Sequence, residues 1–183
     1  DVVFLMVANM LPNRHYPITA RAFLRFVQKV SSTNGGHALN SFRFVMVGTG
    51  ADLEQMKELA SLHPELVVVP GVSFEEMLKL YAAADVYVHG GTEPASTALV
   101  IGAISHLPVM SSPAVGCTAD VVRDGETGML ISDYLSEDEW VAAFERIWNR
   151  RIDWSTFGNC ARRRSHALDC ECVTKDFLNL IKK

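Results

Sequence analysis

Six short stretches of the chain are apolar at nearly every position, and this feature constrains the fold most. They are residues 2–8, 42–48, 66–70, 85–90, 107–112 and 128–132. Strands buried on both faces have this continuous apolar pattern, because helices cover both sides of a parallel sheet. Amphipathic helical patterns separate the first runs, at residues 17–30, 51–62 and 73–84. The alternation predicts an α/β fold with a doubly wound, six-stranded parallel sheet and helices on both faces.

Length and composition favour one domain. The chain has 183 residues, of which 49% are hydrophobic and 21% charged, as in ordinary globular proteins. We therefore expect a single Rossmann-like domain over residues 1–183, with helices within residues 136–183 after the sheet. Trp140, Phe144 and Trp148 lie on one helical stripe there. We expect these aromatic side chains in the core rather than in a ligand platform.

Charge and hydropathy exclude several classes of partner. The formal net charge is −4, whereas nucleic-acid-binding surfaces are usually basic, so we expect no nucleic-acid partner. The one dense basic run, Arg162 to Arg164, is interpreted as the solvated face of a helix, with a polyanion site as the alternative. No apolar run approaches the roughly 18 to 20 residues of a membrane span, and no signal peptide is recognisable. We expect a cytoplasmic protein without a membrane span.

The cysteines predict neither a disulfide scaffold nor a metal site. There are four, Cys117, Cys160, Cys170 and Cys172, which is few for a chain of this length. Three of them lie near His166, but the paired CxxC spacing of a structural zinc site is missing. We expect no bound metal.

The loop after the second apolar run contains two glycines that could bring the backbone close to a ligand. In open parallel sheets, ligands bind at the carboxyl ends of the strands, and Gly48 and Gly50 follow residues 42–48 at that edge. A complete dinucleotide motif would need a third glycine where Leu53 stands. We therefore assign Gly48 and Gly50 to the ligand site but do not expect a dehydrogenase.

The loop HGGTEPAST, residues 89–97, carries more chemical information. Ala95, Ser96 and Thr97 are expected to present free N–H groups at the start of a helix, which attract a phosphate. Glu93 could accept hydrogen bonds from sugar hydroxyl groups beside that phosphate. Alternatively, Glu93 only favours the start of the helix through its charge.

The order of motifs resembles the C-terminal, donor-binding domain of retaining glycosyltransferases of family 4, which have two Rossmann-like domains (the GT-B fold). The similarity covers essentially all of the chain. The segments that carry it are ANMLPNRHYPITARAF, FRFVMVGTGADLEQMKELA, VVVPGVSFEEMLKLYAAADVYVHGGTEPASTALV, LPVMSSPAVGCTADVVRDGETGMLI and FGNCARRRSHALDCECVTKDFL. The resemblance implies that the donor substrate is a nucleotide-diphosphate sugar and that no cofactor or metal is needed.

The resemblance also implies roles for individual residues. Arg14 stands where the family has a lysine that contacts the donor diphosphate. Arg14 and the amides of Ser96 and Thr97 would stabilise the leaving diphosphate. Glu93 would orient the sugar, so that Glu93 and Arg14 form the catalytic pair. Val72 and Ser73 would face the base.

Some family positions are changed in this chain. Asn9 replaces an arginine, and Cys117 replaces the second of two glycines. Ile101 occupies the position of a second glutamate that usually accepts hydrogen bonds from the ribose. We therefore expect the phosphate cradle to be retained and ribose recognition to be altered.

Two hypotheses of function follow. In the first, the chain is the donor-binding domain of a glycosyltransferase and is inactive alone, because an N-terminal domain of the same protein binds the acceptor. The start at Asp1, without methionine, supports this view of the chain as half of an enzyme. In the second, it is a non-catalytic, glycosyltransferase-like binding module, in which Asn9 and Ile101 mark lost donor chemistry.

Overall fold

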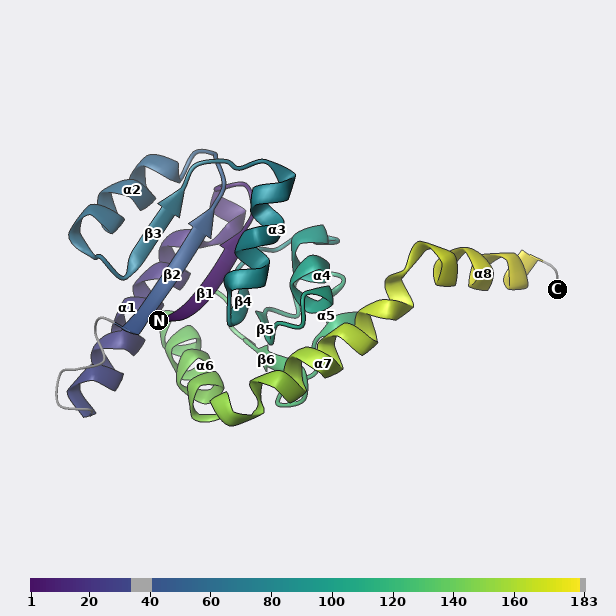
Figure 1. Cartoon of the computed structure of the whole chain (residues 1–183). Coiled ribbons are helices and arrows are strands. Elements are labelled where there is room, and N and C mark those ends of the chain that lie inside the picture. Colours follow the sequence, from purple (N-terminus) through teal and green to yellow (C-terminus); the bar gives the residue numbers. More distant parts are fainter. Residues whose placement is uncertain (34–40, 182–183) are drawn as a thin grey trace.

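The computed structural model describes residues 1–33 and 41–181, and residues 34–40 and 182–183 lie outside the description. Its centre is a parallel six-stranded sheet with the strand order β3-β2-β1-β4-β5-β6 (Figure 1). The strands are β1 (Val2–Val7), β2 (Phe42–Val47), β3 (Leu66–Val69), β4 (Val86–His89), β5 (Val109–Ser111) and β6 (Gly128–Leu130). The predicted doubly wound parallel sheet is confirmed.

Helices follow the strands along the chain. The α-helices are α1 (Tyr16–Thr33), α2 (Leu53–Leu62), α3 (Phe74–Ala83), α4 (Thr97–Ile104), α5 (Thr118–Val121), α6 (Glu137–Asn149), α7 (Trp154–Ser165) and α8 (Cys170–Ile181). Short 3₁₀ turns are η1 (Pro12–Arg14), η3 (Arg151–Asp153) and η4 (His166–Leu168). The last helix, α8, extends away from the sheet (Figure 1). Within residues 1–33 and 41–181, no helix has both the length and the apolarity needed to cross a membrane.

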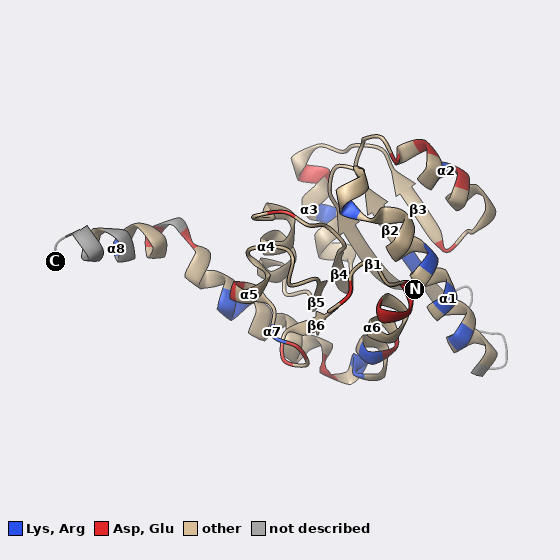
Figure 2. Cartoon of the chain, turned by 180° about the vertical axis from the view of Figure 1, so that it is seen from behind, with Lys and Arg blue, Asp and Glu red and all other residues tan. Residues whose placement is uncertain are grey.

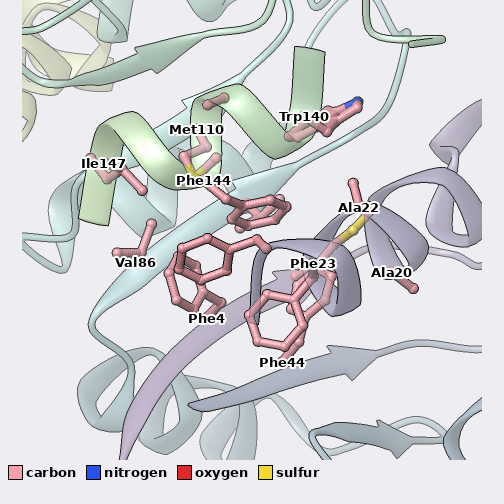
Figure 3. Packing of buried hydrophobic residues seen from close by; sticks show 14 of the residues in the cluster. Phe4, Ala20, Ala22, Phe23, Phe44, Val86, Met110, Trp140, Phe144 and Ile147 are labelled. Carbon is pink, nitrogen blue, oxygen red and sulfur yellow. The ribbon is translucent and has the colours of Figure 1, made fainter. Parts of the chain in front are cut away.

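One face of the sheet carries a core built around phenylalanine rings. Phe4 of β1 lies between Phe23 of α1 and Phe144 of α6, with ring centroids 5.4 Å apart in both pairs (Figure 3). Trp140 is also fully buried in this cluster, and Trp148 packs against it. The predicted core role of the aromatic stripe in α6 is therefore confirmed. Such edge-on ring pairs add to the stability that area burial alone provides.

Ion pairs on the surface join α1 to α6 above this core. Arg25 and Lys29 of α1 contact Asp138 and Glu145 of α6 at 2.7 and 2.9 Å. Figure 2 shows basic residues on α1 and acidic residues on the start of α6. Because these side chains are exposed, each pair contributes at most about 1 kcal/mol, and the aromatic core supplies most of the attachment.

The opposite face of the sheet packs against α3, α4, α5 and α7. Side chains alternate between the two faces along each strand, so Leu5 and Tyr87 belong to this second cluster while Phe4 and Val86 belong to the first. Tyr81 of α3 stacks on Tyr87 with the centroids 5.5 Å apart. Helices thus cover both faces, as predicted.

The predicted start of α3 is also confirmed. The hydroxyl of Ser73 accepts from the amide of Glu76 at 3.2 Å, and the Glu76 carboxylate accepts from the amide of Ser73 at 2.9 Å. This reciprocal capping box satisfies two backbone donors that the helix cannot satisfy internally. It determines where the loop after β3 ends.

Candidate functional site

A cleft of about 270 Å³ lies at the carboxyl ends of β1 and β4. From β1 the chain adds strands toward one edge of the sheet as far as β3, and from β4 it adds them toward the other edge. Open α/β sheets bind ligands at the point where this direction changes. The cleft is lined by Val7, Ala8, Asn9, Arg14, Glu93, Ala95, Ser96, Thr97 and Ala98. The structure therefore brings five of the predicted site residues together, from the loops after β1 and β4.

Arg14 and Glu93 form an ion pair at this cleft, between Nη2 of Arg14 and Oε2 of Glu93. Only 15% of the Arg14 side chain and 14% of the Glu93 side chain are exposed. The Nε and Nη1 atoms of Arg14 are buried and find no acceptor in the part of the chain that the structure describes. Arg14 thus retains unsatisfied donors, which an anion could use once the guanidinium turns toward the cleft.

The second carboxylate oxygen of Glu93 has a different partner, His89 at the end of β4. Nε2 of His89 lies 2.6 Å from Oε1 of Glu93, and the His89 side chain is fully buried. On the other side of the ring, Nδ1 lies 3.2 Å from the Tyr87 hydroxyl. That hydroxyl is 3.3 Å from the backbone carbonyl of Val7. A continuous hydrogen-bonded chain therefore links the cleft to the interior of the sheet.

These contacts determine the protonation of Glu93. Burial tends to raise the pKa of the Glu93 carboxyl, but the hydrogen bond and electrostatic attraction from His89, together with the charge of Arg14, outweigh burial and hold this pKa below its ordinary value. Glu93 is therefore a carboxylate at neutral pH. Burial raises the pKa of Tyr87 well above its ordinary value, so Tyr87 takes part as a neutral hydroxyl group.

The start of α4 differs in one respect from the expectation. Ser96 caps the helix, because its hydroxyl accepts from the amide of Leu99 at 3.3 Å. The amide of Ser96, which was expected to be free, donates to Sγ of Cys117 at 3.2 Å. The reason is that Cys117 places a sulfur acceptor where the family that the chain resembles has a glycine.

Two amides at this helix end remain available. Thr97 and Ala98 are the first residues of α4, so no preceding helical carbonyl can accept from their N–H groups. No other acceptor for them is present within residues 1–33 and 41–181. Both residues line the cleft beside Arg14. The available donors are therefore at Thr97 and Ala98 rather than at Ser96 and Thr97.

Gly48 and Gly50 have a structural reason for their conformation. A Cβ on Gly48 would lie 1.9 Å from the carbonyl oxygen of Ala8, and one on Gly50 would lie 2.4 Å from that of Met10. Both have φ near +150°, where side chains are strained. The two glycines allow the loop after β2 to pack against the segment after β1. They do not line the cleft, and their contact with a ligand stays a prediction.

Val72 and Ser73 also lie outside the lining of the cleft. The hydroxyl and the amide of Ser73 are both engaged by Glu76 in the capping box. A role for Val72 and Ser73 in facing a base stays a prediction.

The basic run at the end of α7 does not contribute to this cleft. Arg162 and Arg163 line a separate hollow of about 460 Å³, and Arg162 contacts the ring of His106. Both arginines are exposed and lie in the last helical turn, where positive charge is favoured by the helix dipole. In the described part of the chain, no three His, Cys, Asp or Glu side chains gather as a metal site would require.

Two residues that contact lining residues of the cleft, His89 and Cys117, were not assigned to the site from the sequence. His89 ends an otherwise apolar strand and precedes Glu93 by four residues, and a polar residue in a fully buried run is a detectable signal. Cys117 was considered only as one of four cysteines and as a replaced glycine. Its contact with Ser96 joins loops that are 21 positions apart, which spacing alone does not reveal.

Residues 1–150 match a family model described as glycosyl transferases group 1. An uncharacterized glycosyltransferase of Methanocaldococcus jannaschii is 31% identical over 98 residues, which cover 51% of this chain and 25% of that protein. A GDP-mannose-dependent alpha-mannosyltransferase of Corynebacterium glutamicum is 25% identical over 138 residues, covering 72% of this chain and 32% of that protein. The chain thus spans about a quarter to a third of these curated relatives.

Solved structures of other proteins share the fold at low sequence identity. The pneumococcal O-GlcNAc transferase GtfA, in complex with UDP and GlcNAc, aligns with a TM-score of 0.80 and 13% identity over 98% of this chain and 35% of that chain. Anabaena HepE, in complex with UDP, aligns with a TM-score of 0.79 and 16% identity over 100% of this chain and 49% of that chain. Since the family model covers well over half of its residues, this chain belongs to the glycosyl transferases group 1 and is a domain of the GT-B type.

Proposed function

We propose that the cleft binds the diphosphate of a nucleotide-sugar donor, and that the chain is the donor-binding domain of a retaining glycosyltransferase of family 4. In this proposal an N-terminal domain of the same protein binds the acceptor. The isolated chain would bind the donor without transferring its sugar. No metal takes part in the proposed diphosphate contacts.

One observation carries the proposal: a guanidinium with unsatisfied donors and two available helix amides, from two different loops, lie at one cleft. Arg14 brings a full positive charge from η1, and the amides of Thr97 and Ala98 add the positive end of the α4 dipole. Helix N-termini with free N–H groups bind phosphate. A diphosphate offers enough oxygen acceptors for both elements.

The same groups suit the chemistry of transfer. When the bond between the sugar and the diphosphate breaks, negative charge accumulates on the leaving phosphate oxygen. Arg14 and the two amides would stabilise that charge, which lowers the barrier if their contacts are stronger in the transition state than in the ground state. Glu93, as a carboxylate, would accept a hydrogen bond from a hydroxyl group of the sugar and hold the sugar in place.

Similarity to solved proteins supports the ligand class. GtfA was solved with UDP and GlcNAc, and HepE was solved with UDP and with UDP-glucose. Because their sequence identity to this chain is low, the similarity establishes the fold alone. The local donors at the cleft therefore provide the main support for a nucleoside diphosphate here.

A second candidate function is a binding module that has lost donor chemistry. It is favoured by the pairing of Arg14 with Glu93 and by the contact of Cys117 with the Ser96 amide, because both reduce the donors available to a ligand. Ile101, which occupies the position of a family carboxylate, also favours the binding-module candidate.

Thermal-shift titration with UDP, GDP and ADP separates the two candidates. A ligand that binds only the folded chain stabilises it, by about 2.7 kcal/mol at a concentration 100 times its Kd. We expect one nucleotide to raise the melting temperature of the wild type. Arg14→Gln should reduce that shift, and Arg163→Gln, a matched change at an exposed arginine outside the cleft, should not. If no nucleotide stabilises the wild type at millimolar concentration, the binding-module candidate is favoured.

A further inference from the structure

Glu93 divides its two oxygens between two basic partners. Oε2 contacts the guanidinium of Arg14, and Oε1 lies 2.6 Å from Nε2 of His89. One partner can therefore leave while the other keeps the carboxylate in position. This division distinguishes Glu93 from an ordinary ion pair, which is lost as a whole when its cation moves.

Arg14 cannot offer its remaining donors to a ligand from its present position. Nε and Nη1 are buried, and the guanidinium packs so closely on Gly91 that a Cβ there would lie 3.2 Å from Nη1. A diphosphate in the cleft would reach these donors only after the guanidinium turns away from Glu93. That movement would leave a largely buried carboxylate without its cation, at a cost in desolvation.

His89 is placed to remove that cost. Because a carboxylate only accepts hydrogen bonds, Nε2 of His89 must carry the proton that it shares with Glu93. Nδ1 faces the Tyr87 hydroxyl, which can accept from a protonated Nδ1 while it donates to the Val7 carbonyl, or donate to an unprotonated Nδ1 instead. The Nε2 proton is present in both states of the ring.

The ring of His89 is held rigidly. Its side chain has no exposed surface, and it stacks on Tyr87 with centroids 6.2 Å apart. A Cβ at Gly91 would lie 3.0 Å from Nε2, so any side chain at this position would press on the contact between His89 and Glu93. Tyr87 and Gly91 thus restrict the donor to one direction, toward Oε1.

We propose that His89 is the positioning residue of the donor site, which holds Oε1 of Glu93 so that Oε2 can exchange Arg14 for a hydroxyl group of the donor sugar. Arg14 then turns to the diphosphate. The inference rests on the proposed donor site and adds a residue that acts on the substrate only through Glu93. It predicts that binding of the nucleoside diphosphate depends on His89 only when residue 93 is charged.

Two isosteric substitutions separate the two nitrogens of the ring. The amide of His89→Gln reaches the position of Nε2 and keeps a donor for Glu93, whereas the shorter His89→Asn mimics Nδ1 and keeps only the contact with Tyr87. Calorimetry with the nucleotide that stabilises the wild type should give a Kd for His89→Gln within about threefold of the wild type. His89→Asn should weaken binding by about 10- to 100-fold, the value of one hydrogen bond to a charged group.

A double-mutant cycle excludes a merely structural role. In a Glu93→Gln background, His89→Asn should change the Kd by less than about threefold, because no stranded charge remains to be stabilised. An equal loss in both backgrounds would overturn the proposal, as would failure of His89→Gln to restore binding. His166→Gln, at an exposed histidine of η4, serves as the matched control and should bind like the wild type.

Nitrogen NMR of the ligand-free chain tests the inference without any nucleotide. Long-range ¹H–¹⁵N spectra should show His89 protonated at Nε2, and Glu93→Gln should shift that resonance. An unprotonated Nε2 would overturn the positioning role even if nucleotides bind. Conversely, a protonated Nε2 that responds to residue 93, in a chain that binds no nucleotide, would support the contact and refute the proposed donor site.

Discussion

Replacing Glu93 by glutamine should tighten the binding of a bare nucleoside diphosphate. In the ligand-free chain, Arg14 contacts the carboxylate through Nη2, and both side chains are about 15% exposed. Arg14 keeps its own charge in both proteins, so the substitution removes only the attraction between the two charges, which is about 1 kcal/mol for an exposed pair and up to about 4 kcal/mol at 4 Å near a protein surface. Releasing Arg14 from glutamine should therefore cost about 1–2 kcal/mol less than releasing it from glutamate. Removal of the carboxylate also removes its repulsion of the phosphates.

The expected result is a Kd for the nucleoside diphosphate about 5- to 30-fold lower in Glu93→Gln than in the wild type, measured by calorimetry at fixed salt. The corresponding nucleotide sugar should gain less, because a glutamine is a weaker acceptor for its hydroxyl groups. Glu58→Gln, at an exposed carboxylate outside the cleft, controls for the same change in net charge. An unchanged or weaker affinity of Glu93→Gln for the nucleoside diphosphate would show that Arg14 does not exchange partners.

Three further predictions concern the core, the pH dependence and the start of α4. Phe144→Ala should lower the free energy of unfolding by about 3–5 kcal/mol, and the melting temperature by about 6–20 °C, because it empties the centre of the aromatic cluster. In denaturant titrations, the control Phe74→Ala, at a ring that is 66% exposed, should change the free energy of unfolding by less than about 0.5 kcal/mol. The folded-state pKa of Glu93 is held below its ordinary value near 4.5, so the contribution of Glu93 to stability is present above pH 4.5 and is lost as the pH falls through the folded pKa. In urea titrations between about pH 5 and pH 3, the wild type should therefore lose more stability than Glu93→Gln. Equal losses would contradict the ion pair. Cys117→Ala frees the amide of Ser96 and should tighten nucleoside diphosphate binding by about two- to tenfold in calorimetry, whereas weaker binding would show that the sulfur supports the site.

The fold could be predicted because its signals are local and repeated. Each apolar run became a strand, and the main differences lie at the ends. The run 66–70 stops at Val69 because Pro70 has no N–H for the ladder. The helix expected over residues 17–30 extends to Thr33, where the hydroxyl of Ser31 bonds back to the carbonyl of Val27 at 2.8 Å.

Part of the membership of the cleft could be predicted, since Gly48, Gly50, Val72 and Ser73 do not line it, but its hydrogen bonds could not. Glu93 was expected at the ligand-binding edge because parallel strands place their carboxyl ends together, and Arg14 was assigned to the same site by the family resemblance. That they contact each other depends on loops 79 residues apart in the sequence, as does the 3.0 Å bond from the Thr92 amide to the Asn13 carbonyl. Side-chain contacts of this kind follow from tertiary packing, which neither periodicity nor motif spacing encodes.

The central claim, that the start of α4 and Arg14 form a diphosphate site, is tested most directly by amide NMR during nucleotide titration. The ¹H–¹⁵N signals of Thr97 and Ala98 and the side-chain Nε signal of Arg14 should shift together and saturate at the Kd that calorimetry gives. Binding that leaves these three signals in place, or that moves only signals elsewhere in the chain, would contradict the site.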